Sequence, residues 1–350
     1  MELLNLLKTA AEKSASDIFI ISGAPLCIKK DGKLVKMDEN PLTPDETRKL
    51  AYEIYKLAGF TFDIDQMPEK EMDFSISVAK MGRFRANVYK QRGSYAAVLR
   101  YVPFALPDPK ELGIPDSIME LSRHKSGIIL VTGPAGIGKS TTLSCIIDRI
   151  NSERNAHIIT IEDPIEFLHK HRKCIISQRE INIDTESYLD ALRAALRQSP
   201  DVILLGEMRD YETISVAMTA AETGQLVLST LHTLGAANTV DRIIDVFPIN
   251  QQHQIRIQLS MVLDAVVSQQ LLPAVNGGMV PAFEIMTVNS AIRTLIRDEK
   301  THQIDTVLQS APGMQTMDGC ILDLFRKGII TAQTAIDYAY NSDIMKKRVQ

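Results

Sequence analysis

The sequence has 350 residues, of which 45% are hydrophobic and 23% are charged, and this composition is typical of a globular protein. At this length we expect two domains, because single hydrophobic cores stop growing at about 250–300 residues. The net charge of −4 disfavours a nucleic-acid partner, and without an apolar run of about 18 residues no membrane span is expected.

The cysteines predict neither a zinc site nor a disulfide framework, because no C-x-x-C pair exists. They are isolated from one another at Cys27, Cys145, Cys174 and Cys320. Residues 1–16 predict an amphipathic helix and lack the charged-then-apolar layout of a signal peptide. We therefore expect a cytoplasmic protein.

Residues 17–102 predict a small α+β domain built on an antiparallel sheet. Strands are expected at 17–23, 25–30 and 33–37, with Asp31-Gly32 as a hairpin turn between the last two. Thr43 to Glu46 forms a capping box with proline at the first helical position, which predicts a helix to about Gly59. Three more strands are expected at 73–80, 83–90 and 94–102.

Four prolines between Pro103 and Pro115 indicate a linker. We therefore expect an N-terminal domain over 1–103, a proline-rich linker over 104–115 and a second domain over 116–350. In the second domain, buried strands at 127–133, 157–162, 201–207 and 225–232 alternate with helices after Lys139, near 187–197 and near 211–223. This alternation predicts a mostly parallel sheet, and the last 70 residues are expected to be helical.

The segment GPAGIGKST matches G-x-x-x-x-G-K-[ST] between a predicted strand and a predicted helix. Such a loop turns its backbone N–H groups inward and holds phosphates at a helix N-terminus. Lys139 would reach the β- and γ-phosphates of ATP, and Ser140 would hold Mg²⁺. The residues predicted to bind nucleotide are Gly133, Pro134, Ala135, Gly136, Ile137, Gly138, Lys139, Ser140 and Thr141.

Carboxylates follow two of the predicted strands. Glu162, Asp163 and Glu166 follow the strand at 157–161, and Glu207 follows the strand at 202–205. Ligands of parallel sheets gather at the carboxyl ends of strands, where these groups could organise Mg²⁺ and aim a water at the γ-phosphate. Gly206 occupies the place where a Walker B strand usually has aspartate, so the Asp163 cluster could supply that function. The alternative is a solvated acidic loop.

His232 lies at the end of the fourth predicted strand, in STLHT. A lone histidine there is more often a structural residue with satisfied hydrogen bonds. Its place beside a phosphate site makes a functional role equally plausible.

Taken in order, these segments resemble the secretion ATPase superfamily of type IV pilus and type II secretion motors. They are the phosphate loop at 133–140, TIEDPIEF at 160–167, GEMRD at 206–210 and STLHT at 229–233. GRFRANVYKQRG, ALRAALRQSPD, TAAETGQLVLSTLHT and AIRTLIR are most similar to the type IV pilus retraction ATPases of twitching motility.

The resemblance implies a PAS-like N-terminal domain joined to a RecA-like P-loop ATPase domain. It also implies a homohexameric ring that hydrolyses ATP with Mg²⁺ to retract pili. The implied partner is the inner-membrane platform protein of the pilus. The ring would lie at the cytoplasmic face of the inner membrane and be attached to it only through partners.

Position by position, Glu166 matches the family's candidate catalytic base and Glu207 its Walker B glutamate, which could also contact Mg²⁺ through water. Arg85 and Arg100 match N-terminal arginines that reach the γ-phosphate, where a guanidinium neutralises charge on the transferred phosphoryl oxygens. Arg83 is a weaker candidate. Which of Glu162, Asp163 and Glu166 is the base stays open.

Three residues depart from the family pattern. Gln225 replaces the usual histidine of ETGHLV, which puts any hydrogen-bonding role of that side chain in doubt. Ser199 replaces aspartate before PD, and Thr294 replaces asparagine in AIRNLIR; both changes are conservative in size and polarity.

Other functions remain open. The chain could be an accessory or regulatory nucleotide-binding ring, or a pilus assembly or type II secretion ATPase. The last two usually carry a longer N-terminal part, and many carry a four-cysteine zinc loop. A RecA-like nucleic-acid motor is disfavoured by the net charge.

The segment NSAIRTLIRDEK predicts a helix capped by Asn289 or Ser290, with Ile292, Leu295 and Ile296 on one face. We expect that face to pack on the ATPase body. Arg293 and Arg297 would then be free to couple the ring to its neighbours or to the platform.

Overall fold

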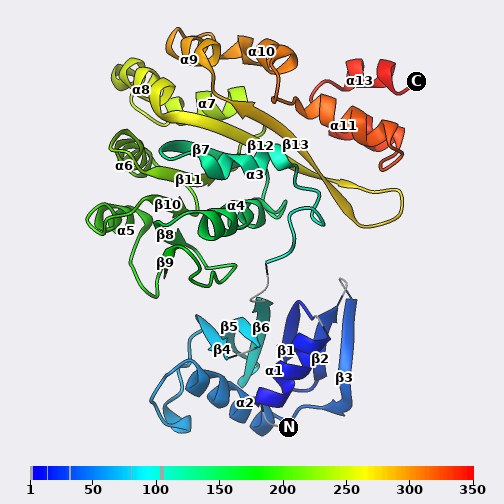
Figure 1. Cartoon of the computed structure of the whole chain (residues 1–350). Coiled ribbons are helices and arrows are strands. Elements are labelled where there is room, and N and C mark those ends of the chain that lie inside the picture. The colour runs from blue at the N-terminus through cyan, green and yellow to red at the C-terminus, as the bar shows by residue number, and fades with distance from the viewer. Residues whose placement is uncertain (1–2, 14, 31–32, 80, 103–105) are drawn as a thin grey trace. The chain divides into compact units, whose positions relative to one another are not determined.

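The computed structural model describes residues 3–13, 15–30, 33–79, 81–102 and 106–350. The chain forms two compact units, Met1–Ala105 and Leu106–Gln350 (Figure 1). Leu106, Leu112 and Ile114, from the region expected to be a linker, pack in a core of the second unit. Pro103 lies outside the described residues.

The first unit is an antiparallel sheet with the strand order β3-β2-β1-β6-β5-β4. Its elements are α1 (Leu3–Glu12), β1 (Asp17–Ile20), β2 (Pro25–Lys30), β3 (Lys33–Pro41), α2 (Pro44–Leu57), η1 (Ile64–Gln66), β4 (Met72–Val78), β5 (Gly82–Gln91) and β6 (Ser94–Val102). Leu6 and Leu7 of α1 and Ile54 and Tyr55 of α2 are buried in one core with the sheet. The predicted α+β architecture is therefore confirmed.

Local sequence signals explain where α2 and the first hairpin form. The Thr43 side chain accepts a hydrogen bond from Glu46 N, and the Glu46 carboxylate accepts one from Thr43 N at 2.7 Å, which confirms the capping box. Strands β2 and β3 pair with Lys30 opposite Lys33. The predicted turn residues Asp31 and Gly32 lie outside the described residues.

The second unit is built on a sheet with the order β13-β12-β7-β11-β10-β8-β9, in which only the pairing of β13 with β12 is antiparallel. Its strands are β7 (Gly127–Thr132), β8 (His157–Glu162), β9 (Ile175–Glu180), β10 (Val202–Leu205), β11 (Leu226–Leu231), β12 (Leu263–Pro273) and β13 (Met279–Thr287). The predicted parallel sheet is confirmed, whereas β9, β12 and β13 lie outside the predicted set. Strand β13 also extends into the region expected to be helical.

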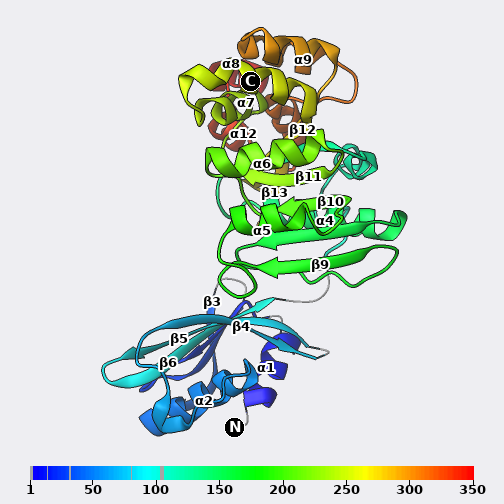
Figure 2. The same cartoon turned by 90° about the vertical axis from the view of Figure 1, so that its left-hand side faces the viewer.

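Helices cover both faces of this sheet. They are α3 (Asp116–Met119), η2 (Glu120–Arg123), α4 (Lys139–Glu153), α5 (Tyr188–Ala195), α6 (Tyr211–Glu222), α7 (Ala236–Asp245), α8 (Ile249–Val262), α9 (Ser290–Arg297), η3 (Thr301–Gln303), α10 (Ile304–Ser310), α11 (Met317–Arg326), α12 (Ala332–Tyr338) and α13 (Ser342–Arg348). Successive β7 residues alternate between two cores: Leu130 packs with α5 and α6, and Val131 packs with α4. Helices α5 and α6 lie in front of the sheet in Figure 2. In the described ranges, no helix combines the length and apolar character needed to cross a bilayer.

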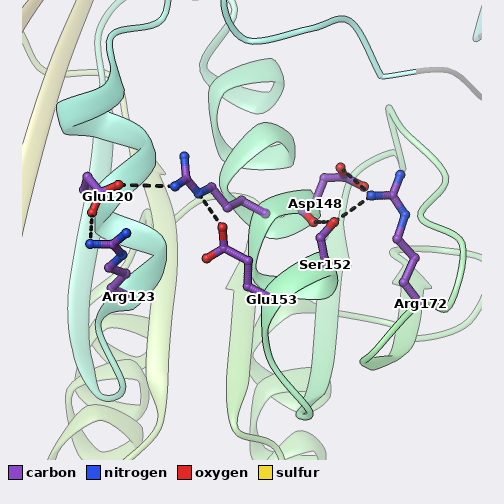
Figure 3. Close-up of polar contacts among 7 residues, drawn as sticks. Glu120, Arg123, Asp148, Ser152, Glu153 and Arg172 are labelled. Atoms are coloured by element: carbon purple, nitrogen blue, oxygen red, sulfur yellow. Dashed lines mark hydrogen bonds and ion pairs between the residues drawn. The ribbon is translucent and has the colours of Figure 1, made fainter.

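Helix α4, which follows the phosphate loop, is fixed on its outer side by ion pairs (Figure 3). Arg149 bonds both Glu120 of η2 and Glu153 one turn further along α4. Arg172, in the segment before β9, bonds Asp148 and Ser152 of α4. These contacts join the segments on either side of α4 to it and so hold the helix that carries Lys139 at its first turn.

Helix α9 packs as expected, but one of its arginines is not free. Asn289 caps the helix by accepting from Ile292 N at 2.9 Å, and Ile292 and Ile296 are buried. Arg293 donates to the carbonyls of Ser260 and Met261 at the end of α8 and to the Asp264 carboxylate. The expectation of a free Arg293 is therefore wrong, because the polar face of α9 turns this side chain toward the unsatisfied carbonyls at the end of α8.

Arg293→Ala should destabilise the second unit by about 2 kcal/mol, since two helix-end carbonyls and a carboxylate lose a charged donor. At this size we expect the midpoint of thermal unfolding to fall by about 5 °C. The matched control is Arg297→Ala. The Arg297 side chain is 54% exposed and, within the described part of the chain, pairs with adjacent Asp298 alone. Equal midpoints for the two variants would contradict this role for Arg293.

Candidate functional site

A cavity of about 270 Å³ lies at the carboxyl ends of β8, β10 and β11 beside the first turn of α4. It brings together most of the predicted site residues of the second unit, which come from four separate segments. Those lining it are Ala135, Gly136, Lys139, Ser140, Glu162, Asp163, Glu166, Glu207 and His232. The other predicted nucleotide-binding residues, Gly133, Pro134, Ile137, Gly138 and Thr141, belong to the same loop and helix start but do not line the cavity.

The loop between β7 and α4 has a conformation that requires glycine. Gly133 has φ 136° and Gly138, the N-cap of α4, has φ 87°, both in a region that L side chains rarely adopt. A Cβ on Gly133 would lie 2.3 Å from the backbone oxygen of Gln269 on β12. The loop is therefore packed closely against the neighbouring strand, and α4 begins with its free N–H groups at the cavity.

Lys139 is the buried cation of the cavity. Its Nζ donates to the backbone oxygens of Gly133 and Pro134, both at 2.8 Å, and lies 3.4 Å from His232 Nδ1. Burial lowers the pKa of Lys139, while the nearby Glu207 and Glu166 carboxylates act in the opposite direction. The ammonium group is thus held by neutral carbonyls, which anionic phosphate oxygens can replace with a gain in attraction.

The three carboxylates of IEDPIE have different environments. Asp163 and Glu166 are exposed, whereas Glu162 is 7% exposed and its Oε1 accepts from Thr160 Oγ1 at 2.7 Å and Gln178 Nε2 at 3.2 Å. Burial raises the pKa of Glu162 to about 7. Near neutral pH, Glu162 is therefore partly protonated.

Glu207 lies between two basic side chains. Its Oε1 is 2.6 Å from Arg209 Nη2, and its Oε2 is 3.4 Å from His232 Nε2. The contacts of His232 fit an imidazole that accepts from Lys139 at Nδ1 and donates to Glu207 at Nε2. His232 therefore links the cation of the phosphate loop to the carboxylate after β10. The position of Arg209 in GEMRD does not indicate a role, because the sequence does not show that this side chain turns back to Glu207.

Two unusual positions in the motifs have structural explanations. A Cβ on Gly206 would lie 2.8 Å from Tyr188 Oη, so the tyrosine occupies the space next to the position where aspartate was expected. Gln225 precedes β11 at its amino end and accepts from Thr223 Oγ1 at 2.8 Å, whereas His232 follows the carboxyl end of the same strand. Gln225 is thus at the opposite edge of the sheet from the cavity.

The donors at the cavity fit a magnesium ion bound together with phosphate. Among the described residues no group of three or more His, Cys, Asp and Glu side chains is placed to hold a metal ion alone. Ser140, at the first turn of α4, offers a hydroxyl, and Glu207 offers a carboxylate. Mg²⁺ is commonly held by one or two protein oxygens together with phosphate oxygens and water, so this small donor set suits it.

The two predicted arginines belong to the first unit and lie opposite each other in the β5–β6 register. Arg85 is exposed, and the Arg100 side chain is 68% exposed with its Nε 3.0 Å from Asp17 Oδ1. Like charges directly opposite on a sheet destabilise it. Asp17 offsets part of this repulsion, and an anion would offset more.

Comparisons with known proteins point to one group. Residues 2–279 match the family model described as Type II/IV secretion system protein. The chain is 42% identical to the type IV pilus retraction ATPase PilT of Pseudomonas aeruginosa, over 97% of this chain and 98% of that protein. It is 43% identical to the twitching motility protein of Neisseria gonorrhoeae, over 98% and 92%.

A solved structure has the same fold over almost the whole length. The crystal structure of the pilus retraction motor PilT with bound ADP superposes with a TM-score of 0.89 at 47% identity, covering 99% of each chain. The similarity therefore includes both compact units.

Because of Glu162, the free energy of unfolding of the wild type should decrease as pH rises, and Glu162→Gln should abolish this decrease. The folded-state pKa of about 7 lies above the ordinary value of 4.5, so between these values the folded chain retains a proton that the unfolded chain has lost. The stabilising contribution of Glu162 to the free energy of unfolding is fully present below about pH 4.5, and it is lost as pH rises through about 7. Glutamine retains an oxygen that can accept from Thr160 and Gln178, while the Glu166 backbone N–H also bonds this carboxylate. At pH 8 we therefore expect the variant to be more stable by at most about 3 kcal/mol.

The measurement is the midpoint of thermal unfolding from pH 5 to 8 without nucleotide. Glu186→Gln, at an exposed position, is the matched control and should keep the wild-type slope. A Glu162→Gln midpoint with the wild-type slope would show that Glu162 is not the titrating group.

Proposed function

The chain belongs to the type II/IV secretion system protein family, as the resemblance of its motifs predicted, and from this premise we propose that it is a type IV pilus retraction ATPase. It hydrolyses ATP and uses the free energy to drive the pilus retraction of twitching motility. Its second unit is a RecA-like ATPase domain, and its first unit is the smaller antiparallel-sheet domain of the family.

One observation supports this proposal above the others. Four segments that are far apart in the sequence meet in a single cavity, and each supplies a group that phosphoryl transfer needs. They are the phosphate loop with Lys139, the segment after β8 with Glu166, the segment after β10 with Glu207, and the end of β11 with His232.

In the proposed mechanism, the N–H groups at the start of α4 and the Lys139 ammonium bind the phosphates of ATP. Lys139 exchanges the carbonyls of Gly133 and Pro134 for phosphate oxygens. The Ser140 hydroxyl and the Glu207 carboxylate would hold Mg²⁺, the latter through water. When bound there, Mg²⁺ would neutralise charge on the phosphate oxygens.

We assign the orientation of the attacking water to Glu166, because its carboxyl group is exposed at the cavity. Glu162 is buried and hydrogen-bonded, so it supports the segment from behind. Asp163 is exposed and lines the cavity as well, so it is the second candidate for this role. His232, between Lys139 and Glu207, would sense whether the γ-phosphate has displaced the lysine contact.

Arg85 and Arg100 are proposed to act on ATP that another copy of the chain holds. Their guanidinium groups would neutralise the charge that spreads over the transferred phosphoryl oxygens. The repulsion between two arginines facing each other on one sheet supports an anionic ligand at this position.

We further propose that the chain assembles as a homohexameric ring, since head-to-tail contacts between identical copies give a closed ring when the rotation between copies closes. Its partner would be the inner-membrane platform protein of a pilus, with no nucleic acid involved. The ring would lie at the cytoplasmic face of the inner membrane, held there only by partners.

Lys139→Ala and Glu207→Gln should each abolish Mg²⁺-dependent release of phosphate from ATP. The first loses the cation that binds the β- and γ-phosphates, and the second loses the charge that organises metal and water. Exposed Glu222→Gln is the matched control and should retain wild-type turnover. A wild-type rate for Lys139→Ala would refute the site. A wild-type chain that binds Mg·ADP without any turnover would instead favour the accessory nucleotide-binding ring.

Arg100→Ala should lower the turnover number at least tenfold and change the affinity for Mg·ADP less than threefold, because the arginine acts on the γ-phosphate. The matched control is Arg92→Ala, at the exposed turn between β5 and β6. The measurements are steady-state phosphate release and calorimetric titration with Mg·ADP. An unchanged turnover number for Arg100→Ala would exclude this role.

A further inference from the structure

Strand β12 carries polar side chains deep inside the second unit, directly behind the phosphate loop. Gln269 is 4% exposed and lies in the centre of the unit, where apolar residues would be expected. It does not line the nucleotide cavity. Burying an amide is unfavourable unless its hydrogen bonds are made, so its partners indicate what it does there.

Both ends of the Gln269 amide are used by the phosphate-loop segment. Nε2 donates to the backbone oxygen of Ile137 at 2.5 Å, and Oε1 accepts from Thr142 Oγ1 at 2.9 Å. Thr142 is 1% exposed and lies in the first turn of α4. The orientation of the amide is thereby fixed, since the reverse orientation would place Oε1 against the Ile137 carbonyl.

The bond to Ile137 determines the direction of the next N–H group. In a trans peptide, the C=O of one residue and the N–H of the next point in opposite directions. Because Gln269 holds the Ile137 carbonyl toward β12, the Gly138 N–H points away from β12. Gly138 is the N-cap of α4, where outward-facing N–H groups bind anions.

Strand β12 approaches the phosphate loop closely at Gln269, next to two glycines of the loop. A Cβ on Gly138 would lie 3.3 Å from Gln269 Nε2, and a Cβ on Gly133 would lie 2.3 Å from the Gln269 backbone oxygen. The glycines of the loop therefore make room for this one residue of β12 as well as for phosphate.

We propose that Gln269 is a positioning residue of the nucleotide site, which holds the Ile137–Gly138 peptide in the orientation that binds phosphate. It touches neither ATP nor metal and acts only through the loop. The inference rests on the proposed ATP-binding function of that loop.

Removing the Gln269 amide should weaken nucleotide binding much more than it slows the turnover of bound ATP. Without the amide, the Ile137 carbonyl loses its buried partner and the peptide can rotate, so that fewer free molecules have a loop ready to bind. Apparent affinity falls in proportion to that fraction. Bound phosphate restores the loop, so the reaction of bound ATP should change little.

The test compares Gln269→Leu with Gln270→Leu. The second variant makes the same chemical change one residue further along β12, where the amide donates to Tyr338 O at 3.4 Å and to no other residue that the structure describes. We expect Gln269→Leu to weaken Mg·ADP binding about tenfold and to raise the KM for ATP similarly, with kcat within threefold of wild type. Gln270→Leu should bind Mg·ADP within twofold of wild type.

The proposal is overturned if folded Gln269→Leu binds Mg·ADP within twofold of wild type, or if Gln270→Leu loses as much affinity. Should Gln269→Leu fail to fold, Gln269→Met takes its place, because it keeps a side chain of similar length and also removes the amide that bonds Ile137 O. A folded Gln269→Met with wild-type affinity for Mg·ADP also overturns the proposal, and a reduced affinity supports it. If the wild-type chain itself does not bind Mg·ADP, the proposed function is contradicted. This outcome is distinct from failure of the Gln269 proposal, in which the wild type binds and the variant binds equally well.

Discussion

The charge at the carboxyl edge of the parallel sheet constrains everything that the cavity can bind. Its lining contains four carboxyl groups, Glu162, Asp163, Glu166 and Glu207, but only Lys139 and Arg209 as permanent cations. Burial keeps Glu162 partly neutral near pH 7, yet adding a triphosphate would still bring further negative charge to a site with few cations. A magnesium ion and the proposed arginines from outside the cavity would supply the positive charge that such a site needs to hold ATP and stabilise its transition state.

The same edge must also keep two loops in place, and β12 contributes to both. Gln269 bonds the phosphate loop on one side of the strand, while Ser268 Oγ accepts from Gly235 N, three residues after His232, on the other. Opposite Ser268 on β13, the buried Glu284 carboxylate accepts from Ala236 N and Met317 N, at the starts of α7 and α11. Strands β12 and β13 thus hold the phosphate loop, the segment after His232 and the first turns of α7 and α11 by side-chain hydrogen bonds.

Much of the site could be predicted because its motifs directly follow apolar runs. In a parallel sheet those runs end at one edge, so Lys139, Glu166, Glu207 and His232 were expected to converge, and they line one cavity. Strand β12 could not be predicted in the same way, because Ser268, Gln269 and Gln270 interrupt its apolar run with polar residues that are normally exposed. The burial of Ser268 and Gln269 depends on partners far away in the sequence, which no local pattern indicates.

The contacts of Arg293 could likewise not be predicted from local sequence. Helical periodicity places it correctly on the polar face of α9, but whether a polar face meets water or the end of another helix depends on tertiary packing. The fold class and the family follow from local sequence, whereas the use of individual polar side chains follows from contacts between distant segments.

The most direct test of the account combines two impaired chains, one with Lys139→Ala and one with Arg100→Ala, co-expressed with different tags and purified as mixed assemblies. Alone, the Lys139→Ala chain should release no phosphate from ATP, and the Arg100→Ala chain should release it at no more than a tenth of the wild-type rate. If the cavity of one copy is completed by the arginine of another, equal mixing should restore roughly a quarter of the wild-type rate, because about one neighbouring pair in four then contains an intact lysine and an intact arginine. Mixed assemblies without any recovered phosphate release would contradict the account.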